Sequence, residues 1–177
     1  MAGGGWSEKK KGIFVIYLDM DGVFADFDSH YEFHFGMRPT RWPAPDNVNW
    51  NRINSVPDFY RTIPIMPGAR ELFRYVDEVG EGCAFLTGVP ASIDASANQK
   101  IEWAAAHFPE TQVICCPARD KWKHGQPGDT LIDDYLKYRA AWIDMGGLFI
   151  HHTDATSTIG KLRELGKCVP WEPPCVL

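Results

Sequence analysis

The sequence predicts an α/β fold built around a parallel sheet, and three observations lead to that prediction. Short apolar segments alternate along the chain with segments whose apolar residues recur at helical spacing. Residues 13–18 are apolar or aromatic at every position, which is typical of a strand buried on both faces of a sheet. Acidic or hydroxyl side chains follow several of these segments, at the strand ends where parallel sheets bind ligands.

The alternation continues behind this first strand to the end of the chain. The expected strands are 83–86, 113–116, 131–132 and 148–151, and the expected helices are 67–79, 94–107, 136–145 and one carrying apolar residues at 159, 162 and 165. Ser96 and Gln99 have the spacing of a capping box at the start of the second helix. Strands joined by helices predict a parallel sheet with right-handed crossovers.

Residues 29–65 interrupt this alternation. Aromatic side chains are mixed there with arginines, and residues 41–47 are rich in turn-forming residues. We expect a small helical insertion over the carboxyl end of the sheet. The predicted organisation is a flexible tail at 1–12, a core domain of 13–28 and 66–177, and the insertion at 29–65.

The bulk composition restricts the partners and the compartment. The 177 residues suit one domain, and a net charge of -5 argues against a polynucleotide-binding surface. No apolar run is long enough to predict a membrane span. The five cysteines form no CxxC pair, so we expect a reducing, cytoplasmic compartment. The oligomeric state stays open, with a homodimer among the alternatives.

Asp19 and Asp21 stand at the end of the first strand, directly before Gly22. Two carboxylates this close repel each other unless a cation or a shared proton relieves them. Asp-Gly pairs are common in simple turns, but the preceding apolar strand favours a site. A calcium loop is excluded because Val23 and Phe24 occupy the positions that need an oxygen ligand and a glycine.

Three further segments follow in a fixed order. These are Phe85-Leu86-Thr87-Gly88, Arg119-Asp120-Lys121 and Asp129-Thr-Leu-Ile-Asp133-Asp134. With the DxDG segment, they resemble the four motifs of the haloacid dehalogenase-like (HAD) phosphatase superfamily over nearly the whole chain. The resemblance implies a three-layer Rossmannoid sandwich with a central parallel sheet and a small helical cap inserted after the first strand.

The resemblance also implies roles for the acidic residues and a Mg²⁺ cofactor. Asp19 would be the nucleophile that forms an aspartyl-phosphate, and Asp21 the general acid and base. The metal would be held by Asp19, by the backbone carbonyl of Asp21 and by Asp134, with Asp133 behind it or acting through water. Asp133 and Asp134 could instead cap the following helix.

The second and third motifs would bind the phosphate. Thr87 and the backbone N–H of Gly88 are expected on its non-bridging oxygens, and Lys121 on the phosphate and Asp19. Taken alone, a Thr-Gly pair after a strand is usually a loop start. A lone lysine is usually solvated, and Lys123 is a rival for the same role.

Within the superfamily, the sequence is most similar to the 5′(3′)-deoxyribonucleotidases. The similarity lies in residues 19–27, in Phe59-Tyr60 leading to Pro67-Gly68, and in the third and fourth motifs. It implies that Phe27 and aromatic residues of the cap enclose the base, with Trp50, Phe59 and Tyr60 as further candidates. For any single cap aromatic, ordinary packing is the alternative. Gly88 departs from the family, which commonly has a serine there.

The sequence therefore predicts a Mg²⁺-dependent phosphoric monoester hydrolase of the 5′-nucleotidase type, acting on nucleoside monophosphates. One alternative is a HAD phosphatase that acts on a sugar phosphate or another small metabolite. Another is a non-catalytic regulator that binds Mg²⁺ or phosphate, although binding alone would not require the acid/base position of Asp21.

Overall fold

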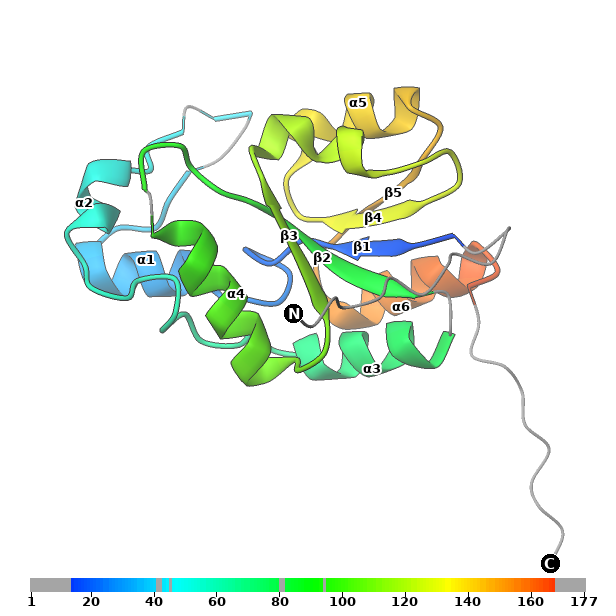
Figure 1. Ribbon diagram of the computed structural model, residues 1–177, viewed down its shortest axis with the longest axis horizontal. Helices are drawn as coiled ribbons and strands as arrows, with labels where there is room; N and C mark the ends of the chain where they lie inside the picture. The colour runs from blue at the N-terminus through cyan, green and yellow to red at the C-terminus, as the bar shows by residue number, and fades with distance from the viewer. Residues whose placement is uncertain (1–13, 41–42, 45, 80–81, 94, 168–177) are drawn as a thin grey trace, which may run out of the picture.

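The computed structural model contains a five-stranded, fully parallel sheet in the order β3-β2-β1-β4-β5 (Figure 1). It describes residues 14–40, 43–44, 46–79, 82–93 and 95–167, so the predicted tail at 1–12 lies outside the described residues. The strands are β1 (Ile16–Leu18), β2 (Cys83–Gly88), β3 (Gln112–Cys116), β4 (Thr130–Asp133) and β5 (Leu148–His151). The predicted parallel sheet is confirmed.

Alternate residues of each strand enter two separate apolar clusters, one on each face of the sheet. In β1, Ile16 and Leu18 belong to the larger cluster, whereas Tyr17 belongs to the smaller one. The same alternation puts Phe85, Ile132 and Ile150 in the larger cluster and Leu86, Leu131 and Phe149 in the smaller one. Both faces of β1 are therefore buried, as its uninterrupted apolar sequence predicts.

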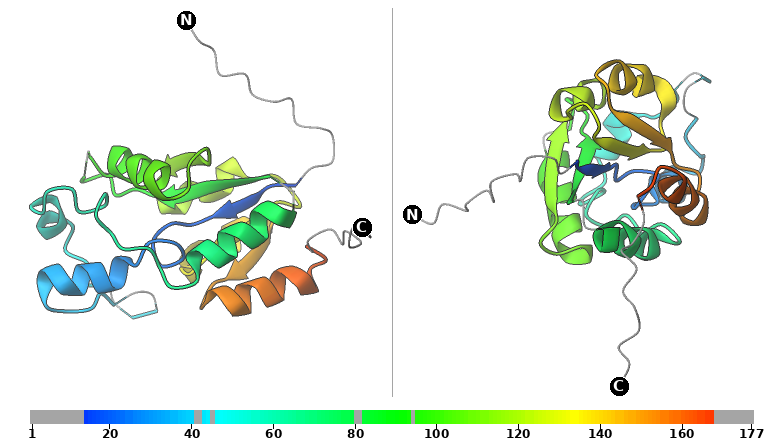
Figure 2. Two further views of the ribbon diagram at one scale, coloured as in Figure 1. Left: turned by 90° about the horizontal axis from the view of Figure 1, so that it is seen from below. Right: turned by 90° about the vertical axis from the view of Figure 1, so that its right-hand side faces the viewer.

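Helices cover both faces and complete three layers (Figures 1 and 2). The larger cluster lies under α3 (Ala69–Val79), α4 (Ser96–His107) and α6 (Ala155–Glu164), and the smaller one under α5 (Arg139–Asp144). Residues 136–138, predicted as the start of one helix with α5, form a separate 3-10 turn, η2 (Leu136–Tyr138). None of the helices in the described part of the chain is long and apolar enough to cross a membrane.

Two short helices, α1 (Phe27–Phe35) and α2 (Trp50–Asn54), lie beyond the carboxyl end of β1, away from α3, α5 and α6 (Figure 1). The segments that lead into and out of this part run side by side. The Asp26 N–H donates to the Pro64 carbonyl at 2.9 Å, and the Met66 N–H donates to the Phe24 carbonyl at 2.7 Å. Leaving and re-entering the core at one place is typical of an inserted cap, and the division at 29–65 stays a prediction.

The predicted capping box at the start of α4 is wrong. The N-cap position is Ala95, which makes no side-chain capping bond. The Ser96 hydroxyl donates to the Ile93 carbonyl instead, and the Gln99 side chain accepts the Tyr60 backbone N–H at 2.9 Å. The Ser96 bond is a local contact with the loop before α4, whereas Gln99 links the returning arm of the insertion to α4.

Candidate active site

Asp19 and Asp21 follow β1, which is the central strand of the sheet. The Asp19 N–H donates to the Ile132 carbonyl of β4, so the ladder continues as far as the first carboxylate. The chain then turns sharply, with the N–H groups of Phe24 and Ala25 both donating to the Met20 carbonyl. This turn exists because Gly22 adopts a left-handed conformation with φ of 81°.

Asp133 and Asp134 end the neighbouring strand β4 and reach the same edge of the sheet. Oxygen atoms of Asp19, Asp133 and Asp134 lie within 4.8 Å of one another. Three carboxylates at this spacing form an all-oxygen donor set, which hard cations such as Mg²⁺ prefer. The residues therefore fit the cation that the sequence predicts.

Lys121 is the positive charge in the middle of these acids. It lies in the 3-10 helix η1 (Ala118–His124), is buried, and forms ion pairs with Asp133 at 2.7 Å and with Asp19 at 2.8 Å. Burial alone would lower the pKa of Lys121, but the carboxylates of Asp133 and Asp19 outweigh it, so the pKa lies above that of free lysine. The rival Lys123 is exposed and pairs with Asp120.

A second buried lysine, which the sequence analysis missed, lies below Asp21. Lys100 of α4 donates to the Asp21 carboxylate at 2.7 Å and to the Thr87 hydroxyl and the Gly88 carbonyl at 2.8 Å each. The Thr87 side chain is fully buried and bonded to this ammonium group. Thr87 therefore contacts Lys100 in this structure, whereas Gly88 lines the cavity above.

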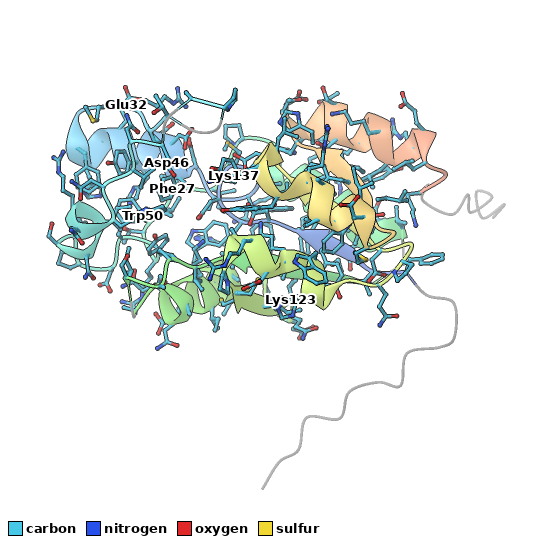
Figure 3. The ribbon with its side chains drawn as sticks, turned by 90° about the horizontal axis from the view of Figure 1, so that it is seen from above. Phe27, Glu32, Asp46, Trp50, Lys123 and Lys137 are labelled. Atoms are coloured by element: carbon cyan, nitrogen blue, oxygen red, sulfur yellow. The ribbon has the colours of Figure 1, made fainter. Side chains whose placement is uncertain are left out.

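Four of these charged groups, Asp19, Asp21, Asp133 and Lys121, line one end of a cavity of about 580 Å³ between the core and the insertion. The remaining lining residues include Phe27 at the start of α1, Trp50 and Tyr60 from the insertion, and Arg119, Tyr135 and Lys137 from the core. Figure 3 shows Phe27, Asp46 and Trp50 on the cap side and Lys137 opposite them, so the two sides of the cavity come from different parts of the chain.

Phe59 does not line this cavity, in contrast to the other predicted cap aromatics. It is 1% exposed, and its ring packs edge-on against Phe27 at 5.7 Å and against Tyr60 at 5.3 Å. It also contacts the rings of His30 and Phe35. The ordinary packing role, which the sequence left open for every cap aromatic, describes Phe59 in this structure.

Comparisons with known proteins bear on the fold. No protein-family model and no curated protein sequence matches the chain. The crystal structure of a HAD family hydrolase from Deinococcus radiodurans R1, with bound phosphate and sodium, matches it with a TM-score of 0.50 and 14% identity. The match covers 90% of this chain and 99% of that chain. The fold is therefore HAD-like. At 14% identity, the comparison shows the fold alone.

The candidate site depends on Gly22 for a second reason, which gives a testable prediction. A Cβ atom at Gly22 would come within 2.1 Å of Asp134 Oδ2, and the positive φ would add about 1–2 kcal/mol of backbone strain. We expect Gly22→Ala to displace Asp134 and to lower the turnover of a phosphate ester by at least about 100-fold. The measurement is phosphate release together with the melting temperature.

The matched control is Gly160→Ala, in the interior of α6. Nothing lies within 4 Å of a Cβ atom there, so this variant should keep full activity and gain about 0.5–1 kcal/mol of stability. Full activity in Gly22→Ala would show that Asp134 does not need the position it occupies here.

Proposed function

We propose that the protein is a Mg²⁺-dependent phosphomonoesterase that acts on nucleoside monophosphates, with deoxyribonucleotides preferred. The observation that carries the proposal is the cluster of Asp19, Asp133 and Asp134. Two of these acids, Asp19 and Asp133, pair with Lys121 and line a cavity with aromatic walls. Bound phosphate in the HAD family hydrolase of the same fold supports a phosphorylated ligand.

The chain's own residues provide the groups for two successive displacements. The Asp19 carboxylate attacks phosphorus and the P–O bond to the alcohol breaks, while Asp21 gives a proton to the departing oxygen. Asp21 then takes a proton from water, which attacks the aspartyl-phosphate, releases phosphate and regenerates Asp19. Lys100 keeps the Asp21 carboxylate in place through its 2.7 Å hydrogen bond.

The positive charges explain how an anionic ester can approach an anionic nucleophile. Lys121 contacts Asp19 directly, and Gly88, whose backbone N–H is proposed to bind the phosphate, lines the same cavity. Asp19, Asp134 and the Asp21 carbonyl would hold Mg²⁺, with Asp133 acting through water, and the bound cation would neutralise charge on the phosphate. Charge stabilisation of this kind is the main requirement of phosphoryl transfer.

The aromatic walls support a substrate with a flat base. Phe27, Trp50 and Tyr60 all line the cavity, and Trp50 is 36% exposed, so its ring is accessible. A base that stacks on one aromatic ring typically gains about 1–3 kcal/mol. A small sugar phosphate has no base that could stack on these rings.

The test is phosphate release from a panel of deoxyribonucleoside and ribonucleoside monophosphates, sugar phosphates and an aryl phosphate, with Mg²⁺ or with EDTA. We expect Mg²⁺-dependent release, fastest from the deoxyribonucleotides and abolished by EDTA. In Trp50→Ala, kcat/KM for nucleotides should fall by about tenfold relative to 2-deoxyribose 5-phosphate. Trp122→Ala, which removes a 40% exposed tryptophan outside the cavity, is the control.

The other possible results of this panel each contradict a different part of the proposal. Release from sugar phosphates alone would keep the chemistry and contradict the nucleotide substrate. Release that persists in EDTA would contradict the metal requirement. No release from any ester would favour a regulator that binds Mg²⁺ or phosphate without turnover.

A further inference from the structure

Tyr60 is held rigidly in the wall of the cavity. Its backbone N–H donates to Gln99, and its ring stacks on Phe27 with a centroid separation of 6.4 Å and an interplanar angle of 29°. The Lys100 ammonium lies 5.1 Å from the ring centroid, in cation–π geometry. The side chain is only 2% exposed. Contacts on several sides therefore fix the ring and the hydroxyl that it carries.

The Tyr60 hydroxyl itself has no hydrogen-bond partner among the described residues. Buried polar groups nearly always have a partner, because leaving one unsatisfied is costly. The pKa of Tyr60 is raised by burial and, to a lesser extent, by the negative charge of Asp21, so the phenol stays protonated and able to donate. A buried donor that lines a cavity and lacks a protein partner indicates a partner in the ligand.

The neighbours of Tyr60 indicate which part of the ligand accepts the hydrogen bond from its hydroxyl. Lys100 contacts its ring, and the nearby Asp21 has one carboxylate oxygen, Oδ1, that is likewise buried without a partner in the described chain. The ring of Phe27 also stacks on the ring of Tyr60. Tyr60 thus adjoins both the group proposed to protonate the departing oxygen and the aromatic part of the cavity, next to the alcohol of the ester.

We propose that the Tyr60 hydroxyl donates a hydrogen bond to an oxygen of the leaving alcohol, and thereby selects esters with a hydroxyl or ether oxygen two or three bonds from the ester oxygen. The sugar of a nucleotide or sugar phosphate has such an oxygen, whereas an aryl or simple alkyl phosphate has none. This inference rests on the proposed phosphomonoesterase and specifies its substrate class.

The test compares two esters that differ in one ring atom. Tetrahydrofurfuryl phosphate has an ether oxygen two carbons from the ester oxygen, and cyclopentylmethyl phosphate has a methylene there. We expect the wild-type protein to have a higher kcat/KM for the ether. In Tyr60→Phe, which removes only the hydroxyl, the ratio of the two kcat/KM values should fall by about tenfold.

Thermal unfolding separates this role from a structural one. Because the hydroxyl has no partner among the residues that the structure describes, Tyr60→Phe should melt at the same temperature as the wild-type protein or above it. Tyr31→Phe is the matched control, since the Tyr31 hydroxyl accepts the Asn49 N–H at 3.0 Å and Tyr31 does not line the cavity. That variant should melt at a lower temperature and keep the wild-type ratio.

Two results would overturn the inference. An unchanged ratio in Tyr60→Phe contradicts it and leaves the phosphomonoesterase proposal standing, because both esters are still hydrolysed. The absence of release from both esters and from an aryl phosphate in the wild-type protein contradicts the proposed function, and the inference with it.

Discussion

Replacing Asp19 with asparagine is expected to lower kcat by at least about 1,000-fold while the protein remains folded. The amide keeps the size of the side chain and one oxygen, but it cannot form the bond to phosphorus. Folding should survive because Lys121 keeps its 2.7 Å ion pair with Asp133. The measurement is steady-state phosphate release with Mg²⁺ present, together with circular dichroism and the melting temperature.

The control for this variant is Asp120→Asn, the same chemical change in the neighbourhood of the site. Asp120 pairs with Lys123 at the surface and does not line the cavity, so turnover should stay near the wild-type value. If Asp19→Asn kept a tenth or more of the wild-type kcat, Asp19 could not be the nucleophile. A protein that only binds phosphate or Mg²⁺ has no turnover for Asp19→Asn to remove.

The second large effect is expected from Lys121→Met. Methionine fills a similar volume but leaves the buried carboxylates of Asp19 and Asp133 without the ammonium that they share. Removing one partner of a buried ion pair typically destabilises a protein by about 3–5 kcal/mol. We expect a loss of this size in urea unfolding in EDTA, and a loss of activity, because the charge that draws phosphate to Asp19 is gone.

The stability of Lys121→Met should depend on pH in a definite direction. Burial already raises the pKa of Asp133 against the opposing effect of Lys121, so without the lysine it should rise further. A carboxyl group with a raised pKa in the folded state binds protons more readily there than in the unfolded chain. Lowering the pH below 7 should therefore restore part of the stability that Lys121→Met loses.

Two further variants test whether unpaired buried charge causes the destabilisation of Lys121→Met. Lys123→Met removes an exposed ion pair and should change stability little. Adding Asp133→Asn to Lys121→Met removes one of the unpaired charges and should recover part of the loss. If the double variant were less stable than Lys121→Met, uncompensated buried charge would not be the reason for the destabilisation.

The acidic part of the candidate site could be predicted from the sequence because its residues stand at the carboxyl ends of strands. An uninterrupted apolar run places Asp19 at the end of a central strand, and a shorter apolar segment, Leu131–Ile132, stands before Asp133. In a parallel sheet, adjacent strands bring their carboxyl ends to one edge, so residues distant in sequence meet there. In the structure these strands are the neighbours β1 and β4.

Lys100 could not be assigned in this way because it lies in the middle of a helix, where no motif marks it. A signal was present nevertheless. The buried positions of α4 are Ser96, Lys100, Trp103 and Ala104, which is the spacing of the stripe that faces the core. A lysine on such a stripe must have a partner for its charge, and Lys100 has Asp21.

Other side chains have contacts that local sequence patterns do not encode. Ser96 and Gln99 satisfy a local pattern for helix capping, but their partners are a loop carbonyl and the insertion. Phe59 looks like Tyr60 in sequence, yet neighbouring residues in an irregular segment need not face the same way, and of these two only Tyr60 lines the cavity. The contact of Gln99 and the different positions of Phe59 and Tyr60 depend on how the insertion packs on the core.

The strand order also determines when the catalytic groups can meet during protein synthesis. β1 leaves the ribosome first of the described strands, but its neighbour β4 comes much later, as the bond from the Val15 N–H to the Asp129 carboxylate across 114 positions illustrates. Until then, one edge of an entirely apolar strand is unpaired, which makes a nascent chain prone to aggregation and a target for chaperones. Most of the polypeptide must therefore be made before Asp133 and Asp134 can lie beside Asp19. Fragments released before that point cannot assemble the site.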